Sequence, residues 1–573
     1  MPCAAPRACP CAPSATPPAA RRAAGGRPAR APAGRCARAL VPAPAQRRAG
    51  ALLAAVAALA CMLLAATGPS PVRAQEIQVG LSAAVTSMDP HFHNLSPNNN
   101  VMEHLYDTLV AKDGQYRLRP GLAESWRSVD ELTWEFRLRR GVRFHDGSEF
   151  TAADVVATLN RAPNVPKSPS SFGIYTRQIA EVKVIDSHTL RVRTRSPYPL
   201  LPNDLSTIYV IPARFERAST DDFNSGRAAV GTGPWRLVRW QADDRIELAR
   251  NDAYWGGKAP WERAVLRIIP RDPTRVAALL AGEVRAIENV PTADLARLAT
   301  HREVVLHRTT SNRFIYLHMD SARDRSPFVA DAAGRPLERN PLRDARVRRA
   351  MSMAINRQAI AERVMDGAAV PTGQLLPAGL FGYVPGLRAP APDPEGARKL
   401  LAEAGYPDGF SVVLHTPNDR YVNDEQVAQA VAGMLSRAGI RTRVEAMPSA
   451  VFFSRGNNLE FSLLLAGWAA ATGEASSSLR SLLATFDKAR GMGVSNRGRY
   501  SNPKVDQLTD KGLGTLDDAA REKLFQAATE VAMADMGVIP LYHQVAVWAT
   551  RRGIGFSPRT DEATWAHELR PAP

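Results

Sequence analysis

The sequence predicts an α/β protein with mixed sheets and at least two lobes. Strand patterns and helix patterns alternate along the whole chain. Several neighbouring strand patterns are joined by short turns, so antiparallel pairs are present. The chain has 573 residues, which is more than one core usually serves, and its composition of 45% hydrophobic and 23% charged residues is ordinary for a globular protein.

The first 74 residues predict a secretory signal peptide rather than part of the fold. Residues 1–50 contain no acid, and Arg47 and Arg48 precede an apolar run over residues 51–67. The segment Val72-Arg73-Ala74 is suited to cleavage before Gln75. This order of basic, apolar and cleavable parts favours removal of the segment over its retention as a membrane anchor.

A lipoprotein anchor at Cys61 is the weaker alternative. Cys61 lies inside the apolar run, and the residues before it, Ala58-Leu59-Ala60, match a lipobox poorly. We therefore expect a periplasmic protein released by cleavage.

Removal of residues 1–74 changes the cysteine content and the charge. All five cysteines lie in this segment, so the remaining chain offers no disulfide, thiolate metal site or cysteine nucleophile. Ten arginines and no acids leave with it, which lowers the net charge from +17 to +7. A mildly basic exported protein is not expected to bind nucleic acid.

The strand patterns are clearest in three places. Residues 132–139 alternate apolar and polar side chains, as in a half-buried strand. Residues 181–195 predict a hairpin that turns at Asp186-Ser187, and residues 235–250 predict another that turns near Ala242-Asp243.

The helix patterns carry start and stop signals. Residues 393–405 offer Asp393 as N-cap, a proline at the first helical position and Gly405 as the stop. Residues 342–367 predict one helix with an apolar face that includes Val347 and Met351 and with arginines opposite. Near the C-terminus, a helix leads into a strand that starts at Pro540.

The stretch FHDGSEFTAADVV, residues 144–156, resembles a catalytic cluster because it contains a histidine and three acidic side chains. Asp146 and Gly147 predict a tight turn. Thr151 and Asp154 predict a capping box for a helix that starts at Ala152. This structural interpretation explains every polar side chain in the stretch except His145.

The segment Leu122 to Ala162 closely resembles the signature segment of the peptide/nickel family of bacterial extracytoplasmic solute-binding proteins. Further blocks agree in the same order, including residues 231–262, residues 393–410 and Gly467-Trp468. The likeness covers nearly all of residues 76–570. It implies a two-lobed periplasmic-binding-protein clamshell with an enlarged first lobe.

The resemblance also implies two crossings between the lobes. We place them near residues 314–320 and 538–542. Lobe one is then 75–313 plus 541–573, with an inserted subdomain at about 119–229, and lobe two is 314–540.

The function implied by the resemblance is capture of a peptide or peptide-like solute and its delivery to the permease subunits of an ABC importer. We expect a monomer without a cofactor. Receptors for a nickel complex, an opine or an oligosaccharide are alternatives, and so is a chaperone-like role. An enzyme alternative is a metal-dependent hydrolase that uses His91, His93 and Asp146, but the sequence lacks HExxH and G-x-S-x-G spacing.

The resemblance locates the solute contacts. In peptide-binding relatives, an aspartate shortly after the Gly-Trp pair holds the ligand's amino group, and here Ala471 stands in its place. The first acid that follows is Glu474, within a TGEA string similar to a glutathione-binding branch. Glu474 takes over the ammonium, or the ligand has none.

Other candidates are an aromatic wall at Trp468 and a carboxylate partner at Arg420. Asn94 and Ser96 fit a cleft lip in the loop after the first strand, and Tyr175 is a further candidate. The full set of predicted ligand-binding residues is Asn94, Ser96, Tyr175, Arg420, Trp468, Thr472, Gly473 and Glu474. The alternate histidines His91 and His93 would share one face of a strand, but two histidines make an incomplete metal site, so no metal is predicted.

Overall fold

The structure is a computed structural model that describes residues 75–572. The predicted signal peptide, its cleavage segment and Cys61 lie outside the described residues.

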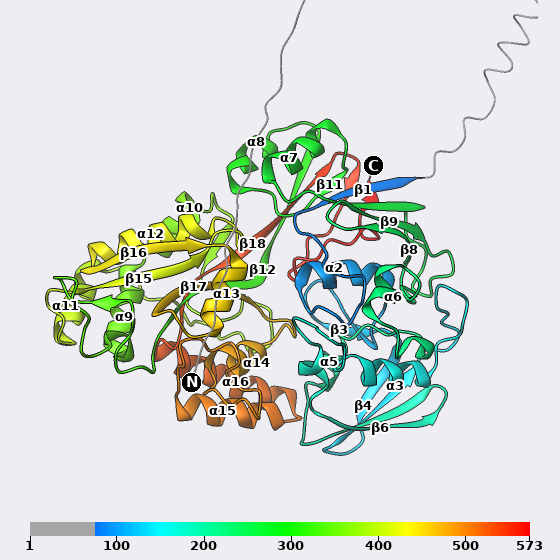
Figure 1. Cartoon of the computed structure of the whole chain (residues 1–573), viewed down its shortest axis with the longest axis horizontal. Coiled ribbons are helices and arrows are strands. Elements are labelled where there is room, and N and C mark those ends of the chain that lie inside the picture. The colour runs from blue at the N-terminus through cyan, green and yellow to red at the C-terminus, as the bar shows by residue number, and fades with distance from the viewer. Residues whose placement is uncertain (1–74, 573) are drawn as a thin grey trace, which may run out of the picture. The chain divides into compact units, whose positions relative to one another are not determined.

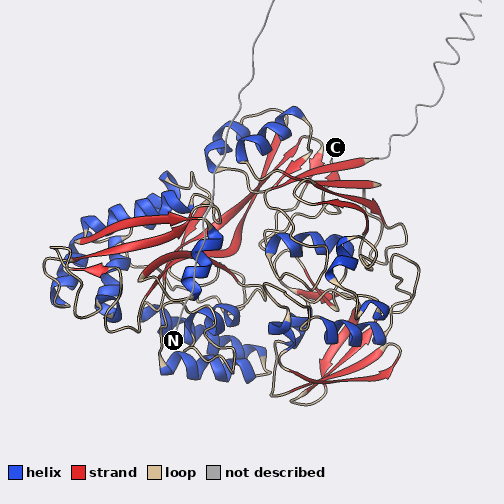
Figure 2. Cartoon of the chain, in the orientation of Figure 1, coloured by secondary structure: helices blue, strands red, loops and turns tan. Residues whose placement is uncertain are grey.

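The strands and helices alternate along the chain, as the sequence predicts (Figure 2). The strands are β1 Glu76–Leu81, β2 Val110–Lys112, β3 Leu118–Pro120, β4 Ala123–Ser128, β5 Thr133–Leu138, β6 Ile179–Asp186, β7 Thr189–Thr194, β8 Trp235–Gln241, β9 Arg245–Arg250, β10 Arg263–Ile268, β11 Ala286–Ile287, β12 Val304–Met319, β13 Val329–Ala330, β14 Ala369–Pro371, β15 Phe410–Pro417, β16 Ile440–Met447, β17 Leu463–Ala469, β18 Ile539–Arg551, β19 Ile554–Gly555 and β20 Arg570–Pro571. The α-helices are α2 Ser96–Leu105, α3 Ala152–Arg161, α4 Gly173–Thr176, α5 Leu201–Leu205, α6 Thr220–Asn224, α7 Asp272–Ala281, α8 Leu295–Ala299, α9 Ala345–Ala354, α10 Arg357–Arg363, α11 Pro394–Glu403, α12 Asp424–Arg437, α13 Ser449–Asn457, α14 Ala475–Ser478, α15 Pro503–Gly514 and α16 Asp518–Ala534. Short 3₁₀ turns are η1 Ala213–Phe215, η2 Thr292–Asp294 and η3 Pro341–Arg343, and η4 Leu479–Leu483 is a π-helical turn.

A twelve-stranded mixed sheet is the framework. Its order is β13-β15-β17-β12-β18-β11-β1-β10-β9-β8, with β14 on β18 and β16 on β15. Parallel pairs such as β1 with β10 coexist with antiparallel pairs such as β10 with β9. The predicted α/β class with mixed sheets is confirmed.

Two long strands run side by side through this sheet, as Figure 1 shows for β12 and β18. Their register shifts between Thr310 and Phe314. Before the shift, β12 pairs with the part of β18 that also contacts β11; from Arg313 onward it pairs with β17 as well. The neighbours of β12 therefore change at this bulge.

The three predicted antiparallel features are present. β5 falls within residues 132–139, β6 and β7 form the first hairpin, and β8 and β9 form the second. β4, β5, β7 and β6 make a separate four-stranded sheet.

The predicted helix at residues 393–405 is confirmed. The Asp393 side chain accepts the N–H of Gly396, and Gly405 has a φ of +94° just past the end of α11. The predicted helix-to-strand passage near the C-terminus is also confirmed as α16 and β18.

The single helix predicted within residues 342–367 is wrong. α9 ends at Ala354, Ile355 is extended, and the Asn356 side chain caps the new helix α10 by accepting the N–H of Ala359. An asparagine that can cap a helix start competes with helix continuation. Arg348 is also buried rather than exposed, because its guanidinium donates to the Asp535 carboxylate at 2.8 Å.

The structural interpretation of residues 144–156 is confirmed. Gly147 has a φ of +89°, and Thr151 and Asp154 form the capping box of α3. His145 joins this segment to the start of β8: its Nε2 lies 3.1 Å from the Gly233 carbonyl oxygen, and its Nδ1 accepts the Gly231 N–H at 3.2 Å. Burial lowers the pKa of His145 to about 4, so the ring is neutral at physiological pH.

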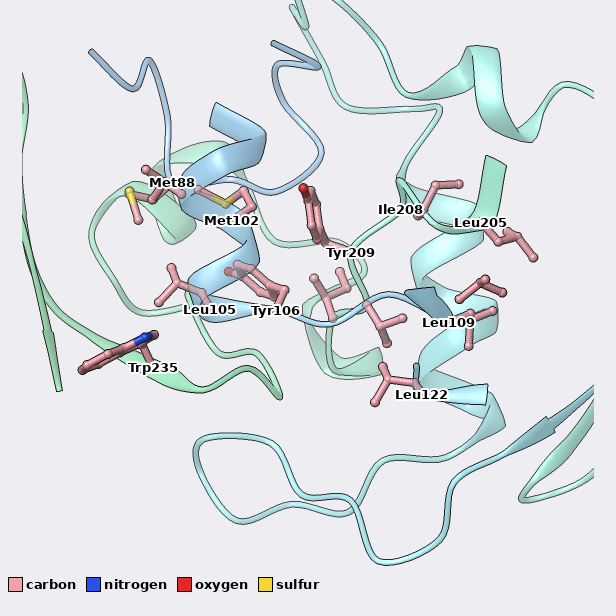
Figure 3. Packing of buried hydrophobic residues seen from close by; sticks show 14 of the residues in the cluster. Met88, Met102, Leu105, Tyr106, Leu109, Leu122, Leu205, Ile208, Tyr209 and Trp235 are labelled. Atoms are coloured by element: carbon pink, nitrogen blue, oxygen red, sulfur yellow. The ribbon is translucent and has the colours of Figure 1, made fainter. Parts of the chain in front are cut away.

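The buried apolar residues form separate cores. The largest cluster draws on residues 77–286 and 546–569. Figure 3 shows part of it, where Met102 and Leu105 lie near Tyr106 and Trp235. Two further clusters are built from residues 314–542.

Across residues 75–572, none of the helices combines the length and the apolar character needed to cross a membrane.

Candidate ligand-binding cavity

A cavity of about 1000 Å³ lies between segments that belong to different cores. One side comes from α2, β2 and the segments around residues 270–275 and 559–565, and the other from residues 418–426 and the end of β17. Arg313, in the bulge of β12, also lines it. A cavity of this volume with mixed polar walls suits a small polar solute.

Three of the eight predicted residues line this cavity: Ser96, Tyr175 and Arg420. Asn94 lies beside it, because its side-chain amide donates to the Tyr175 hydroxyl at 3.1 Å. Tyr175 is buried, and burial raises the pKa of its hydroxyl, which therefore stays protonated and able to donate.

Arg420 is held on the segment between β15 and α12. The backbone N–H groups of Arg420 and Tyr421 both donate to one carboxylate oxygen of Asp424 at 3.0 Å, which fixes the local backbone. The guanidinium lies 5.5 Å from the Tyr421 ring and has no carboxylate within 4 Å among the described residues. Burial, followed by repulsion from Arg313, lowers the pKa of Arg420. The cavity therefore contains a half-buried cation without a counter-ion.

Lys112 is a second half-buried cation that lines the cavity, and it was not among the residues predicted from the sequence. It ends β2, and its ammonium donates to the Ala471 carbonyl oxygen at 3.2 Å. No carboxylate of residues 75–572 lies within 4 Å of this ammonium. Burial lowers the pKa of Lys112, while the charge of Glu103 opposes that shift. In the sequence, nothing distinguishes this lysine from any lysine at a strand end.

Glu103, on α2, is the acid that faces Lys112. Its carboxyl accepts the Tyr209 hydroxyl at 3.3 Å. Burial raises the pKa of Glu103 to about 7, against an opposing effect of Lys112. A charged group that binds close to this carboxyl at neutral pH would therefore change its ionisation.

The three buried arginines of the cavity are neutralised within the protein, and the first, Arg275, pairs with Asp272 at 2.5 Å. Arg313 pairs with Glu562 at 2.6 Å, and Ser311 donates to the same carboxylate at 2.7 Å. Burial alone would raise the pKa of Glu562, but Arg313 outweighs burial and lowers it. Arg559 pairs with Asp561 at 2.6 Å and with Glu568 at 2.8 Å.

The segment from Trp468 to Glu474 lies behind the cavity wall rather than on it, apart from Ala469 and Ala471. Trp468 packs against the apolar cluster that contains Phe314 and Val538, and its ring N–H donates to Ser477 at 3.3 Å. Thr472 is buried, and its carbonyl oxygen accepts the Asn203 amide at 3.3 Å. Gly473 has a φ of +72°, and a Cβ at that position would overlap Tyr116.

Glu474 already has a partner inside the protein. Its carboxylate pairs with Arg521 of α16 at 2.8 Å and accepts the Ser476 hydroxyl at 3.0 Å. Both side chains of the pair are about 5% exposed. The geometry therefore directs the carboxylate of Glu474 towards Arg521, so it is not free to receive a ligand ammonium as the sequence analysis expected.

The histidine pair does not occupy a strand. Residues 90–92 form a turn, so His91 and His93 do not share a strand face. The Nε2 of His91 lies 2.7 Å from the Tyr209 carbonyl oxygen, and the Nδ1 of His93 lies 2.9 Å from the Thr86 hydroxyl. Asp146, the third residue of the hydrolase alternative, pairs with Arg214. Within the described part of the chain, no three His, Cys, Asp or Glu side chains are grouped as metal ligands.

Known proteins resemble the chain in both sequence and fold. Residues 117–490 match the family described as bacterial extracellular solute-binding proteins, family 5 Middle. The chain belongs to this family. The glutathione-binding protein GsiB of Escherichia coli O1:K1 / APEC is 29% identical to this family 5 protein over 491 residues, which is 84% of this chain and 91% of GsiB.

Solved structures share the fold of this family 5 protein. DppA from Helicobacter pylori, in complex with the peptide STSA, is 23% identical with a TM-score of 0.74, over 87% of this chain and 98% of DppA. AgaA from A. tumefacien R10, in complex with agropinic acid, is 24% identical with a TM-score of 0.72, over 87% of this chain and 99% of AgaA. The predicted two-lobed periplasmic-binding-protein fold is confirmed.

This family 5 protein is a solute-binding receptor of the kind that serves ABC importers, and it is not an enzyme. The hydrolase alternative is wrong.

Proposed function

We propose that this receptor binds a peptide-like solute that carries at least two carboxylates, and delivers it to the permease of an ABC importer. The observation that carries the proposal is the pair of half-buried cavity cations, Lys112 and Arg420, that have no carboxylate within 4 Å among the described residues. Arg271 also lines the cavity without such a partner, but it is exposed.

A solute carboxylate would satisfy each of these cations. A partly buried cation without a partner loses hydration and gains little in return. A charge-assisted hydrogen bond to a carboxylate contributes roughly 1.5–3 kcal/mol. Arg420 offers a planar fork that matches a carboxylate, whereas Lys112 offers a compact charge beside the Ala471 carbonyl oxygen.

Glu103 supplies the opposite charge for an amino group. An ammonium close to its carboxyl would stabilise the ionised form and lower a pKa that now lies at about 7. Binding of an ammonium at neutral pH would therefore release a proton from Glu103. The cavity thus has groups for both ends of a peptide-like acid.

Glutathione is the first solute to test. It carries two carboxylates, one ammonium and two amide bonds, which match Lys112, Arg420 and Glu103 in charge. The 29% identity to a glutathione-binding protein over most of both chains supports this choice.

The predicted lobe boundaries remain part of the proposal: 75–313 plus 541–573, and 314–540. Two observations support them. The largest apolar cluster uses residues 77–286 and 546–569, whereas two others use residues 314–542. The sheet neighbours of β12 change at Arg313. Closure of these lobes on the solute is a ligand-driven population shift.

We also propose that the protein is exported to the periplasm through a cleaved signal peptide and that it is a monomer. The relatives are periplasmic binding proteins, which supports the location.

Thermal melting of the purified protein against a set of solutes tests the proposal. The set is glutathione, tripeptides with an acidic side chain, agropinic acid, a nickel–histidine complex and a neutral oligosaccharide. A solute that binds the native state raises the melting temperature in a saturable way, by RT ln(1 + [L]/Kd) in free energy. We expect glutathione or another peptide-like acid to do so. Saturable binding of the neutral oligosaccharide with no effect of any acid would overturn the proposal.

A further inference from the structure

A second cavity, of about 540 Å³, shares no lining residue with the solute cavity. One wall is formed by Ile174 of α4, by Arg177 and Gln178 between α4 and β6, and by residues 195–198 after β7. The opposite wall is formed by Arg480 of η4, the turn at residues 489–492 and the end of α15. The two walls come from sequence segments that the predicted boundaries assign to different lobes.

The charge of this cavity is strongly positive. Four arginines line it, Arg177, Arg195, Arg480 and Arg490, against one acid, Asp510. Asp510 neutralises Arg490, with 2.6 Å between the charged atoms.

Arg480 has a partner of a different kind. Its guanidinium donates to the Tyr198 hydroxyl at 3.3 Å, and that hydroxyl donates to the Asp204 carboxylate at 2.7 Å. This contact joins the two walls directly. Two of the four arginines are therefore accounted for inside the protein.

The other two arginines, Arg177 and Arg195, have no ion pair within the described residues. Neither guanidinium has a carboxylate of the described residues within 4 Å. The Arg195 side chain donates to the backbone carbonyl oxygen of Arg177 at 3.1 Å, which places both residues on the same wall. Both arginines are exposed, and an anion bound in the cavity would be attracted by each of their charges.

The position of Arg177 depends on Gly491 of the opposite wall. Gly491 has a φ of +70°, and a Cβ there would collide with the Arg177 guanidinium. The absence of a side chain lets this cation reach across to the other wall. The guanidinium thus lies against Gly491 of the opposite wall, while Arg177 as a whole remains exposed to solvent.

We infer that this cavity is a second binding site, for a small anion with at least two negative charges of phosphate or carboxylate type. Guanidinium groups match both oxyanions through paired hydrogen bonds. An anion held by Arg177 and Arg195 and also close to Arg490 would tie the two walls together. Such binding stabilises the arrangement in which the walls face each other, independently of the solute.

Calorimetric titration of the purified protein with phosphate and with citrate, at an ionic strength kept constant with sodium chloride, tests the inference. We expect saturable binding of at least one anion. The double variant Arg177→Gln/Arg195→Gln should weaken it at least tenfold. A matched double variant, Arg137→Gln/Arg441→Gln, removes two exposed arginines that have no ion pair among the described residues and should leave the Kd within twofold.

The outcomes separate the sources of binding. Phosphate alone, citrate alone or both would each support the site and define its preferred oxyanion. Equal weakening by the two double variants would show a non-specific charge effect and overturn the inference, as would a lack of saturable binding by both anions. Arg420→Gln, in the solute cavity, should leave anion affinity unchanged; loss of anion binding in that variant would place the anion in the solute cavity instead.

Discussion

The ammonium of Lys112 donates a hydrogen bond to the carbonyl oxygen of Ala471 at 3.2 Å, at the position where the resemblance implies an aspartate. The protein therefore presents a cation where the resemblance implies an acid that faces the ligand. We therefore expect the solute group at this wall of the cavity to be a carboxylate and not an ammonium.

Replacement of Lys112 by Met tests whether this lysine binds a carboxylate of the solute. We expect the affinity for glutathione to fall at least tenfold, because one charge-assisted hydrogen bond is lost. The free energy of unfolding should not fall, because a partly buried cation is replaced by an apolar side chain of similar length. Isothermal titration calorimetry and urea unfolding measure the two effects.

Lys183→Met is the matched control, since Lys183 is an exposed strand lysine of β6. Unchanged glutathione affinity in Lys112→Met, with the same affinity in the control, would exclude Lys112 from solute binding.

Glu474→Gln separates a structural role from a solute contact. Breaking a buried ion pair by removal of one partner costs about 3–5 kcal/mol. We expect the lower end, because Arg521 keeps a second carboxylate, that of Asp518, at 2.8 Å. Solute affinity should stay within about threefold, because Glu474 does not line the cavity.

Urea unfolding and calorimetry check both parts of this prediction. A stable Glu474→Gln protein that no longer binds an amine-bearing solute would restore Glu474 as the acceptor of the ligand ammonium.

His145→Ala tests the structural interpretation of residues 144–156. The ring bridges two backbone groups near β8. Its removal leaves the Gly231 N–H without its acceptor, at a cost of about 1–3 kcal/mol, whereas the Gly233 carbonyl oxygen still accepts the Asn251 amide. Solute affinity should stay within about threefold. Loss of binding by a folded variant would show that this histidine contributes directly to recognition.

Glu103 predicts a pH dependence of stability. Its folded-state pKa of about 7 lies above its usual value of 4.5 because of burial. The folded protein therefore binds more protons than the unfolded chain between these values, and stability falls as the pH rises from about 4.5 to about 7. In Glu103→Gln this contribution should be absent.

The difference in free energy of unfolding between Glu103→Gln and the natural protein should grow in favour of the variant over that range and level off above pH 7. A constant difference from pH 4.5 to 8, measured by urea unfolding, would contradict the shifted pKa.

Local sequence patterns predicted much of the fold. The hairpin of β6 and β7 and the capped helices α3 and α11 depend on neighbouring residues, which the sequence shows directly. The break at Asn356 was missed because capping and helix continuation compete at that residue. The start of β12 at Val304 depends on its pairing with β18, whose residues lie far away in the sequence.

The cavity was harder to predict for the same reason. Arg420 was found because it follows a strand in a loop, where binding residues gather. Lys112 and Glu103 acquire their significance only when α2, β2 and the end of β17 come together. The partner of Glu474, Arg521, is on a distant helix and has no signal in the TGEA segment.

The central claim is that Lys112 and Arg420 hold the carboxylates of a peptide-like acid. Calorimetric titration of the natural protein and of Arg420→Gln with glutathione and with its dimethyl ester tests it most directly. The account predicts that the natural protein binds the free acid at least tenfold more tightly than the ester, and that Arg420→Gln loses most of this preference. Equal affinity for acid and ester, or full preference retained by Arg420→Gln, would contradict it.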